Sequence, residues 1–413
     1  MKVQPARNDV SRPRRPGRRS PPPPAILHGP DETLDGACIL DELRDPVGVL
    51  LWQSLHDVIL WASVPPPQRQ GLFRPESVRR RLAVLVGART DPALEAALTS
   101  LAALVGDPAS ARPEAVGPVC LQIARWAETK GKPATALAFA QGAALVVPTD
   151  AAAGLAAGHL ARQLGETARA ETWLRRTVVL GRRSGDRLSL CQACVVLGDL
   201  CAERGDLEAA RPLYLRAFRG ARRSGFREIK AQALYSLFRA ALSDGRPEEA
   251  EAYARGALYA HGRRHPRFAQ VAREVAGFWL ERGRFTDALD TLRLLVPHAR
   301  RPTERIAVLA GVARAAAGAA NVEEYDEAAQ ELWRTLRRTA PGPEGARALL
   351  ELARASVALK RWQSAERAAQ TALELALRHR EGESAAEAEV LLTGIWKELG
   401  GMRCGPEAGP AEG

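Results

Sequence analysis

Apolar residues recur at helical spacing along most of the chain, from about residue 41 to residue 399. Leucine and alanine repeat every three or four positions over stretches of fifteen to twenty residues, and short breaks separate these stretches. No segment shows the apolar–polar alternation between hairpin turns that is typical of strands. The pattern therefore predicts an all-α protein.

Residues 41–110 are predicted to form helices without a repeat. The pairs Asp45-Pro46 and Asp91-Pro92 each combine a capping carboxylate with a proline at the first helical position, which favours a helix start. Three prolines at 65–67 end the first of these helices. We interpret 41–110 as a helical N-terminal extension or cap.

From about residue 117 the chain becomes periodic. Helical stretches alternate with glycine breaks spaced by 34, 40, 40 and 38 residues, and an alanine stands five residues after each glycine. A period in this range predicts stacked helical units, each of which buries its apolar face against its neighbours. The glycines are Gly131, Gly165, Gly205, Gly245 and Gly283.

These units resemble the tetratricopeptide repeat, a helix–turn–helix with a small residue where the two helices cross. The best match is 191–224, and the segments 234–258 and 272–296 repeat its pattern. The units at 117–150, 151–184 and 346–379 are more degenerate. The last has Lys360 at its turn, and 303–340 fits loosely. The resemblance implies a right-handed α-α superhelical solenoid over 117–399. Its first helices line a concave groove for an extended peptide or a partner's helix.

The repeat register assigns residues to that groove. Glutamine recurs at the first inward position, where side-chain amides can bond the backbone of an extended segment. Arginines at later positions suit an acidic group. The alternative is an ordinary solvated helix face. The lysine and asparagine clamp of chaperone-tail-binding members is missing. The predicted partner contacts are Gln192, Asp199, Glu203, Gln232, Tyr235, Arg239, Gln270 and Arg273.

The charge of the chain changes this picture little. The net charge is +11, but residues 1–30 alone account for +6, so the remainder is only mildly basic. Paired arginines recur near predicted helix ends, where cations favour the helix dipole, although a basic ridge along the solenoid is an alternative. Without interleaved aromatic residues, we expect nucleic-acid contact only nonspecifically, through the basic tail.

Both termini differ in composition from the helical region. The proline- and arginine-rich segment 1–30 and the glycine-rich segment 400–413 are predicted to be disordered.

No apolar run is long enough for a membrane span, and an apolar signal-peptide core is missing. Six cysteines without framework spacing predict a reducing cytoplasm. The excess of arginine, 53 against six lysines, indicates a GC-rich bacterial genome.

Candidate chemistry is sparse. The pair Cys191 and Cys194 has redox or zinc spacing, but it lacks further ligands nearby, and the register places Cys194 and Cys201 in the core. Gly262 and Pro266 separate His261 from His265, so these two are not expected to share a helix face. Phosphate-binding loops and a nucleophile–base pair are missing. We expect no catalytic residues, metal or cofactor, and interpret the chain as a non-enzyme.

Two functions fit these observations. The first is a protein–protein interaction scaffold or adaptor that binds a peptide segment or partner helix in the groove. The alternative is a sensor or regulatory module of a bacterial signalling or transcriptional system that lacks its own DNA-binding domain. The sequence identifies neither the partner nor the oligomeric state.

Overall fold

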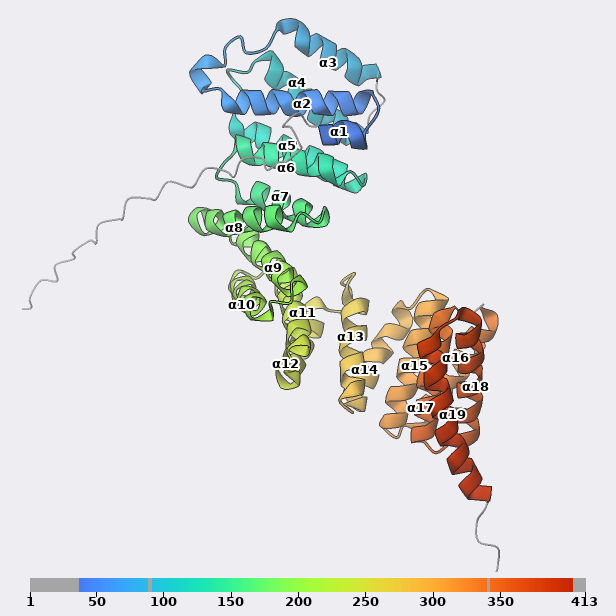
Figure 1. Ribbon diagram of the computed structural model, residues 1–413. Helices are drawn as coiled ribbons and strands as arrows, with labels where there is room; N and C mark the ends of the chain where they lie inside the picture. The colour runs from blue at the N-terminus through green and yellow to red at the C-terminus, as the bar shows by residue number, and fades with distance from the viewer. Residues whose placement is uncertain (1–36, 88–90, 340–341, 404–413) are drawn as a thin grey trace, which may run out of the picture. The chain divides into compact units, whose positions relative to one another are not determined.

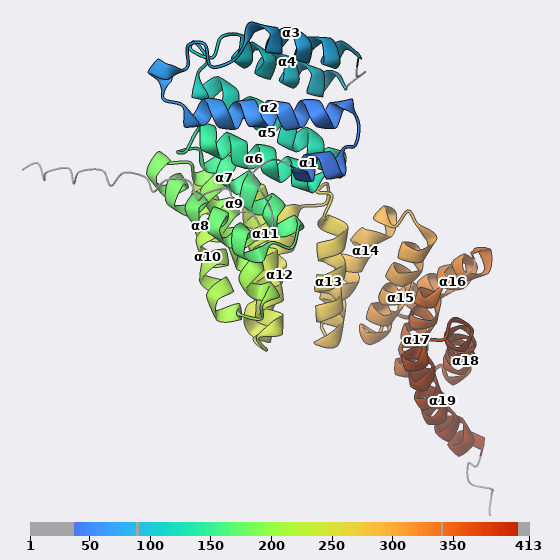
Figure 2. The same cartoon turned by 45° about the horizontal axis from the view of Figure 1, so that its top comes forward.

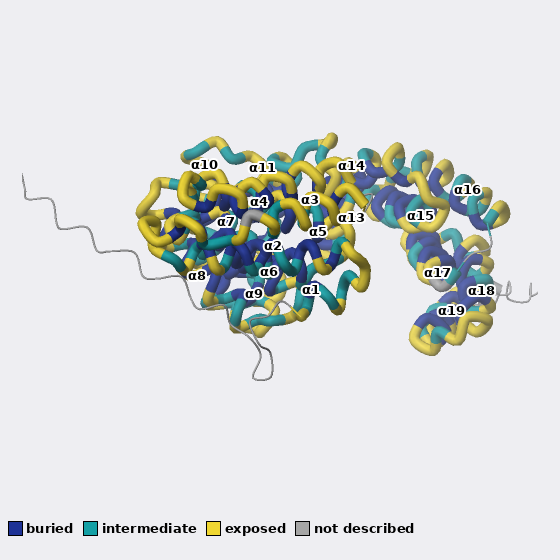
Figure 3. The backbone as a smooth tube through the Cα atoms, turned by 90° about the horizontal axis from the view of Figure 1, so that it is seen from above, coloured by how far each residue is buried: buried dark blue, intermediate teal, exposed yellow. Residues whose placement is uncertain are grey.

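The computed structural model describes residues 37–87, 91–339 and 342–403, and within these ranges every regular element is a helix. The prediction of an all-α fold is confirmed. Contacts divide the chain into two compact units, residues 1–245 and 246–413. Within each unit, successive helices stack as antiparallel hairpins, and the buried residues follow the faces where helices meet (Figures 1 and 3).

The first unit holds α1 to α11. Their bounds are α1 Ala37–Glu42, α2 Pro46–Ser63, α3 Pro75–Gly87, α4 Pro92–Gly106, α5 Pro113–Thr129, α6 Pro133–Val146, α7 Ala151–Gln163, α8 Thr167–Ser184, α9 Arg187–Glu203, α10 Leu207–Ser224 and α11 Arg227–Ser243. A 3-10 turn at Pro66–Gln68 follows α2.

The second unit holds α12 to α19. Their bounds are α12 Pro247–His261, α13 Phe268–Glu281, α14 Phe285–Leu295, α15 Pro302–Gly318, α16 Val322–Arg338, α17 Pro343–Ala358, α18 Trp362–His379 and α19 Gly382–Arg403. A 3-10 turn at Val296–His298 follows α14. Figure 2 shows these helices from a second direction.

Both predicted caps of the N-terminal helices are present. Asp45 Oδ1 accepts from the Gly48 N–H at 2.8 Å, and Asp91 Oδ1 accepts from the Ala93 N–H at 3.0 Å. The helical region begins at Ala37, four residues before the predicted start.

Glu42, at the end of α1, joins this region to the first repeat. Its two carboxylate oxygens accept from the Ala134 and Thr135 N–H groups at 3.0 and 2.8 Å, and its carbonyl accepts from Lys132 Nζ at 2.7 Å. A carboxylate here satisfies the free N–H groups and complements the dipole at the start of α6. One apolar core runs from Ile39 in α1 to Leu200 in α9, so α1–α4 are continuous with the hairpin stack.

The glycine and alanine pattern of the repeats corresponds to a fixed geometry. The five turn glycines at 131, 165, 205, 245 and 283 have φ between 66° and 81°, a left-handed conformation that costs glycine little. The alanines five residues later, Ala136, Ala170, Ala210, Ala250 and Ala288, are all fully buried. Within each unit, these small residues let the two helices of a hairpin approach closely.

Two glycines on first helices serve the same close approach. A Cβ at Gly198 would lie 2.5 Å from the Tyr214 ring, and one at Gly158 would lie 2.7 Å from Leu174. The glycine of the predicted Leu197-Gly198 pair is therefore needed because the neighbouring helix leaves no room for a Cβ.

Two hairpins depart from the pattern. Ala320 and Lys360 take the left-handed turn conformation in place of glycine, with φ of 56° and 55°. Five residues after Lys360 stands the buried Ala365, as in the other units, but five after Ala320 stands Tyr325. The tyrosine fits because the facing helix α15 presents a run of buried alanines, and this explains the loose fit of 303–340.

The C-terminal boundary needs correction. Helix α19 continues to Arg403, so residues 400–403, which we predicted to belong to the tail, are helical. Gly400 and Gly401 each cost only about 1 kcal/mol in a helix, which is too little to end it. The predicted disordered segment 1–30 and the remainder of the C-terminal tail, 404–413, lie outside the described residues. In the described helices we find none with both the length and the apolar character of a membrane span.

Replacing Glu42 with alanine is expected to lower the free energy of unfolding by about 1–2 kcal/mol, because two N–H groups of α6 lose their acceptor. Glu42→Gln retains one acceptor and should lose less. Chemical denaturation measures both. Asp41→Ala, an exposed carboxylate on the same helix, is the control. An equal loss of stability in Asp41→Ala would show that the negative charge of α1 is responsible, and not the two hydrogen bonds from Glu42 to α6.

Two glycine-to-alanine variants should have opposite effects. Gly198→Ala is expected to destabilise the protein by about 1–3 kcal/mol, since the new methyl group overlaps the Tyr214 ring. Gly277→Ala, in α13 with open space around it, should stabilise by up to about 1 kcal/mol through helix propensity. Thermal unfolding of the two variants tests this; the same sign of change in both would contradict it.

Candidate functional site

Two first helices of the first unit, α9 and α11, carry six of the eight predicted contacts. Helix α9 contacts both α7 and α11. Gln192, Asp199 and Glu203 lie on α9, and Gln232, Tyr235 and Arg239 lie on α11. The other two, Gln270 and Arg273, are on α13 in the second unit.

Asp199 is the centre of a polar network that joins three hairpins. Its Oδ1 accepts from Tyr214 Oη at 2.9 Å and from Ser236 Oγ at 3.3 Å. Arg162 Nη1, on α7, lies 4.0 Å from Oδ2. Burial raises the pKa of Asp199, against the lowering effects of Tyr214 and Arg162. Burial and the neighbouring Asp199 raise the pKa of Tyr214, so its hydroxyl stays a donor.

Glu203 extends this network on the surface. Arg162 Nη2 pairs with Glu203 Oε1, and this hydrogen bond is the main cause that raises the pKa of the guanidinium. We call Arg162, Asp199, Glu203, Tyr214 and Ser236 the first-helix network. Two predicted contact residues, Asp199 and Glu203, therefore hold neighbouring hairpins together, and their contact with a partner stays a prediction.

The predicted contacts on α11 are arranged differently. Tyr235 is half-buried, with its ring centroid 6.5 Å from that of Phe238. The Arg239 guanidinium lies 6.0 Å from the Tyr235 ring centroid. Arg239 is exposed, and among the described residues no carboxylate lies within ion-pair distance of it. Gln192 and Gln232 are half-buried on the same two helices. This face thus offers an uncompensated cation beside an aromatic ring and two amides.

In the second unit, Gln270 and Arg273 are both exposed. Gln270 Nε2 donates to Glu274 Oε1 on the same helix at 3.4 Å, a weak contact. In the part of the chain that the structure describes, Arg273 forms no ion pair with a carboxylate. Gln270 is therefore exposed where Gln192 and Gln232 are half-buried, and the ladder of glutamines stays a prediction.

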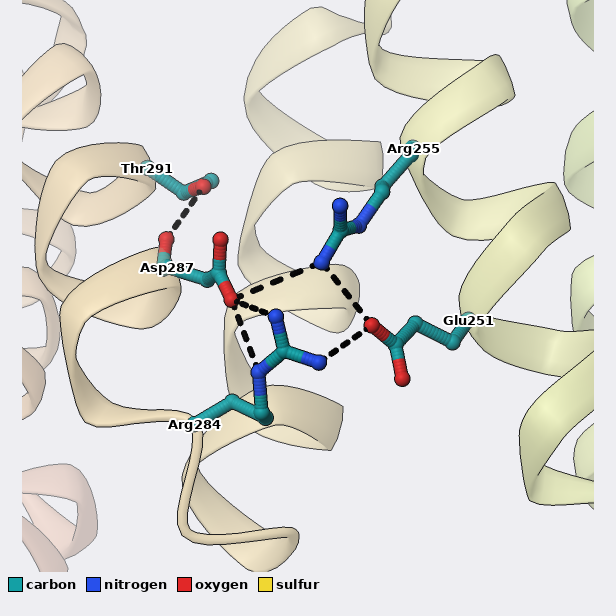
Figure 4. A network of polar contacts seen from close by, with 5 residues as sticks. All are labelled: Glu251, Arg255, Arg284, Asp287 and Thr291. Carbon is teal, nitrogen blue, oxygen red and sulfur yellow. Dashed lines mark hydrogen bonds and ion pairs between the residues drawn. The ribbon is translucent and has the colours of Figure 1, made fainter.

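Arginines near the turns form ion pairs between successive hairpins. Arg284, beside the turn of the α13–α14 hairpin, pairs with Glu251 of α12 and with Asp287, each at 2.5 Å (Figure 4). Arg255 approaches the same two carboxylates at 2.9 and 3.7 Å. In the same figure Thr291 Oγ1 donates to the Asp287 carbonyl at 2.9 Å.

This arrangement recurs in both units. Each pair joins an acid six residues after one turn to an arginine beside the next turn. The pairs are Glu171 with Arg204, Glu251 with Arg284, and Asp326 with Arg361. We call them the turn ion pairs. The sequence prediction missed them, although the acid directly after the crossing residue is a signal that could have revealed them.

Three of the five described cysteines are buried, and Cys38 and Cys201 are partly buried. None of the five cysteines in the described ranges forms a disulfide. Cys191 and Cys194 are buried, and burial raises the pKa of both, that of Cys194 to about 11. Cys201, predicted to be in the core, is only half-buried because it lies near the end of α9. Within the described residues no group of three or more His, Cys, Asp or Glu side chains is arranged to hold a metal.

The two histidines at the end of α12 do not share a helix face, as predicted, because α12 ends at His261. Gly262, with φ of 67°, turns the chain back after His261, and His265 N–H bonds to the Gly262 carbonyl at 3.2 Å. The two rings therefore meet edge to face, with centroids 4.9 Å apart.

A hollow of about 530 Å³, which the sequence analysis did not predict, lies between α16, α17 and α18. Tyr325 and Trp333 line it, with Arg361 and Arg367 over their respective rings, each 5.1 Å from the centroid. Arg361 is neutralised by Asp326, so the hollow lacks an uncompensated charge at that point.

Asp199→Ala is expected to reduce the free energy of unfolding by about 2–3 kcal/mol, because the Tyr214 hydroxyl loses its buried acceptor. Glu203→Ala removes only an exposed ion pair and should cost less than about 1 kcal/mol. Urea denaturation compares them. Equal losses would show that the buried contacts of Asp199 contribute nothing beyond its charge.

The stability of the wild type should also depend on pH through Asp199. Because its pKa is higher in the folded state than the ordinary value of 3.8, the folded chain binds more protons than the unfolded chain. The free energy of unfolding of the wild type, relative to Asp199→Asn, should therefore fall as the pH rises from about 4 to 7. A rise over that range would contradict the burial of the carboxylate.

No protein-family model matches the chain, and no curated protein matches it in sequence. The structure is similar to several solved helical proteins. One is PilF of Pseudomonas aeruginosa, at 16% identity and a TM-score of 0.45, covering 56% of this chain and 96% of that one. Another is a signal transduction ATPase with a tetratricopeptide repeat sensor from Pyrococcus horikoshii, at 15% identity and a TM-score of 0.46, covering 79% and 50%.

A third is a Rap protein in complex with competence and sporulation factor, at 14% identity and a TM-score of 0.40, covering 86% of this chain and 99% of that one. These likenesses are too distant to transfer a function. The chain's own geometry is more informative: left-handed turns, buried alanines five residues later, and stacked hairpins recur in both units. In that architecture each unit is an all-α stack of helix hairpins that resembles the tetratricopeptide repeat.

Proposed function

We propose that the protein is an interaction scaffold, and that the face formed by α7, α9 and α11 binds a segment of a partner protein. The observation that carries the proposal is Arg239, an exposed cation without a carboxylate partner among the described residues, next to the Tyr235 ring. An acidic side chain or a C-terminal carboxylate would complete the bidentate bonding that a guanidinium favours.

The surrounding side chains suit an extended segment. Gln192 and Gln232 each carry amide donors and an acceptor, which is the chemistry needed to bond a peptide backbone. Tyr235 offers a flat, half-buried ring for an apolar residue of the partner. These groups stand on rigid helices rather than on loops.

The first-helix network supports this role by fixing the spacing of the three helices. Asp199 and its partners are joined in the free protein, so the face needs little ordering on binding. A preorganised surface loses less conformational entropy when a partner binds. We place this binding in the cytoplasm, in keeping with the free thiols of the described cysteines.

The test has two stages. Proximity labelling in the native cell identifies partners, and titration with the purified partner segment then measures affinity. Arg239→Glu is expected to weaken binding by roughly tenfold or more, and Gln192→Ala with Gln232→Ala by less. Arg183→Glu, the same charge change at an exposed position of α8, should leave affinity unchanged.

Two outcomes would contradict the proposal. One is a folded bait that enriches no protein reproducibly. The other is a partner whose affinity is the same for the wild type and Arg239→Glu, which would place binding on another surface.

A further inference from the structure

Helix α10 is strongly basic. After Glu208 it carries five arginines and no acidic residue. At the position where α8, α12 and α16 provide the acid of a turn ion pair, α10 has Arg211. Helix α10 therefore has no acid at the position where α8, α12 and α16 each form a turn ion pair.

Three of these arginines line a hollow of about 300 Å³ between α9 and α10. Arg216, Arg219 and Arg223 are spaced three and four residues apart, so they share one helix face. All three are exposed, and among the described residues no carboxylate lies within ion-pair distance of any of them. We call this hollow the α10 arginine pocket.

The helix dipole does not account for these positions. Arginines in the last turn, such as Arg222 and Arg223, are favoured there by the negative end of the helix. Arg216 and Arg219 lie further back, where this effect has faded. Elsewhere on the second helices, arginines such as Arg255 and Arg293 lie against carboxylates.

The floor of the pocket is small and apolar. It consists of the buried Cys191 and Cys194 with the backbone of Gly220. A Cβ at Gly220 would lie 2.5 Å from Cys191 Sγ, so only glycine leaves the two helices this close. The arginines therefore surround a shallow apolar floor without an anion of the protein's own.

We propose that the α10 arginine pocket binds a phosphoryl group. Several guanidinium groups on one face suit an anion with more than one negative charge and several acceptor oxygens, which describes a phosphate ester or a diphosphate better than a single carboxylate. The group belongs either to a small phosphate compound or to a phosphorylated side chain of a protein, and both present the same oxygens to the arginines. The site lies on different residues from the proposed partner face, and its probes need no partner protein.

Isothermal titration of the full chain at constant ionic strength tests this with inorganic pyrophosphate, and with a short phosphoserine peptide beside its unphosphorylated form. The wild type is expected to bind at least one phosphorylated probe. Arg219→Glu should weaken that binding by roughly tenfold or more. Arg222→Glu, on the same helix but outside the pocket, should change it less than about twofold.

The two probes distinguish the sources. Binding of pyrophosphate indicates a small phosphate compound, whereas binding of the phosphoserine peptide alone indicates a phosphorylated protein segment. Either result supports the pocket. Binding of neither probe overturns the proposal, and so does an equal loss in Arg219→Glu and Arg222→Glu, which would indicate a general effect of charge.

Chemical labelling gives a second readout that does not depend on the variants folding. The bound probe should protect Arg216 and Arg219 from phenylglyoxal, as measured by peptide mass spectrometry, while Arg222 stays reactive. Equal protection of all three would overturn the assignment to this pocket.

Discussion

The close contact between the two helices of each hairpin is the constraint on which the structure depends. At every regular crossing a fully buried alanine stands five residues after the left-handed turn. The distance between these backbones determines how the first helices align, and hence where side chains of neighbouring hairpins meet. The first-helix network forms because Tyr214, packed on Gly198, reaches back to Asp199 across this short separation. A larger residue in place of the crossing alanine or of Gly198 would move the two helices apart, and Tyr214 could then not reach Asp199.

The sequence was sufficient for the architecture because its signals are local. A glycine, an alanine five residues later and a helical apolar stripe lie within one hairpin, and Ala365 follows the rule even where Lys360 replaces the glycine. The caps at Asp45 and Asp91 are equally local. Glu42 was missed because it caps a helix that begins 91 residues later, at Pro133.

The candidate sites were harder to predict because their chemistry depends on pairing between hairpins. Register placed Asp199 and Glu203 on the first-helix face, but not against Arg162 from the preceding hairpin or Ser236 from the next. Glu203 is as exposed as Arg239, so exposure alone does not reveal that Glu203 has an ion-pair partner and that Arg239 has none in the described residues. The α10 arginine pocket escaped notice for a related reason, since a run of arginines near a helix end has an ordinary electrostatic explanation.

The turn ion pairs have a mechanical consequence. Each connects two consecutive hairpins at the periphery, as Arg284 does with Glu251, so bending the stack there stretches or compresses a contact between exposed charges. Such contacts are screened by salt, whereas the buried alanine crossings are not. The elastic stiffness of each hairpin stack therefore decreases with rising ionic strength while its helices stay intact. The second helix of the α9–α10 hairpin has Arg211 in place of the acid. The resistance of the stack to bending should therefore differ at this hairpin.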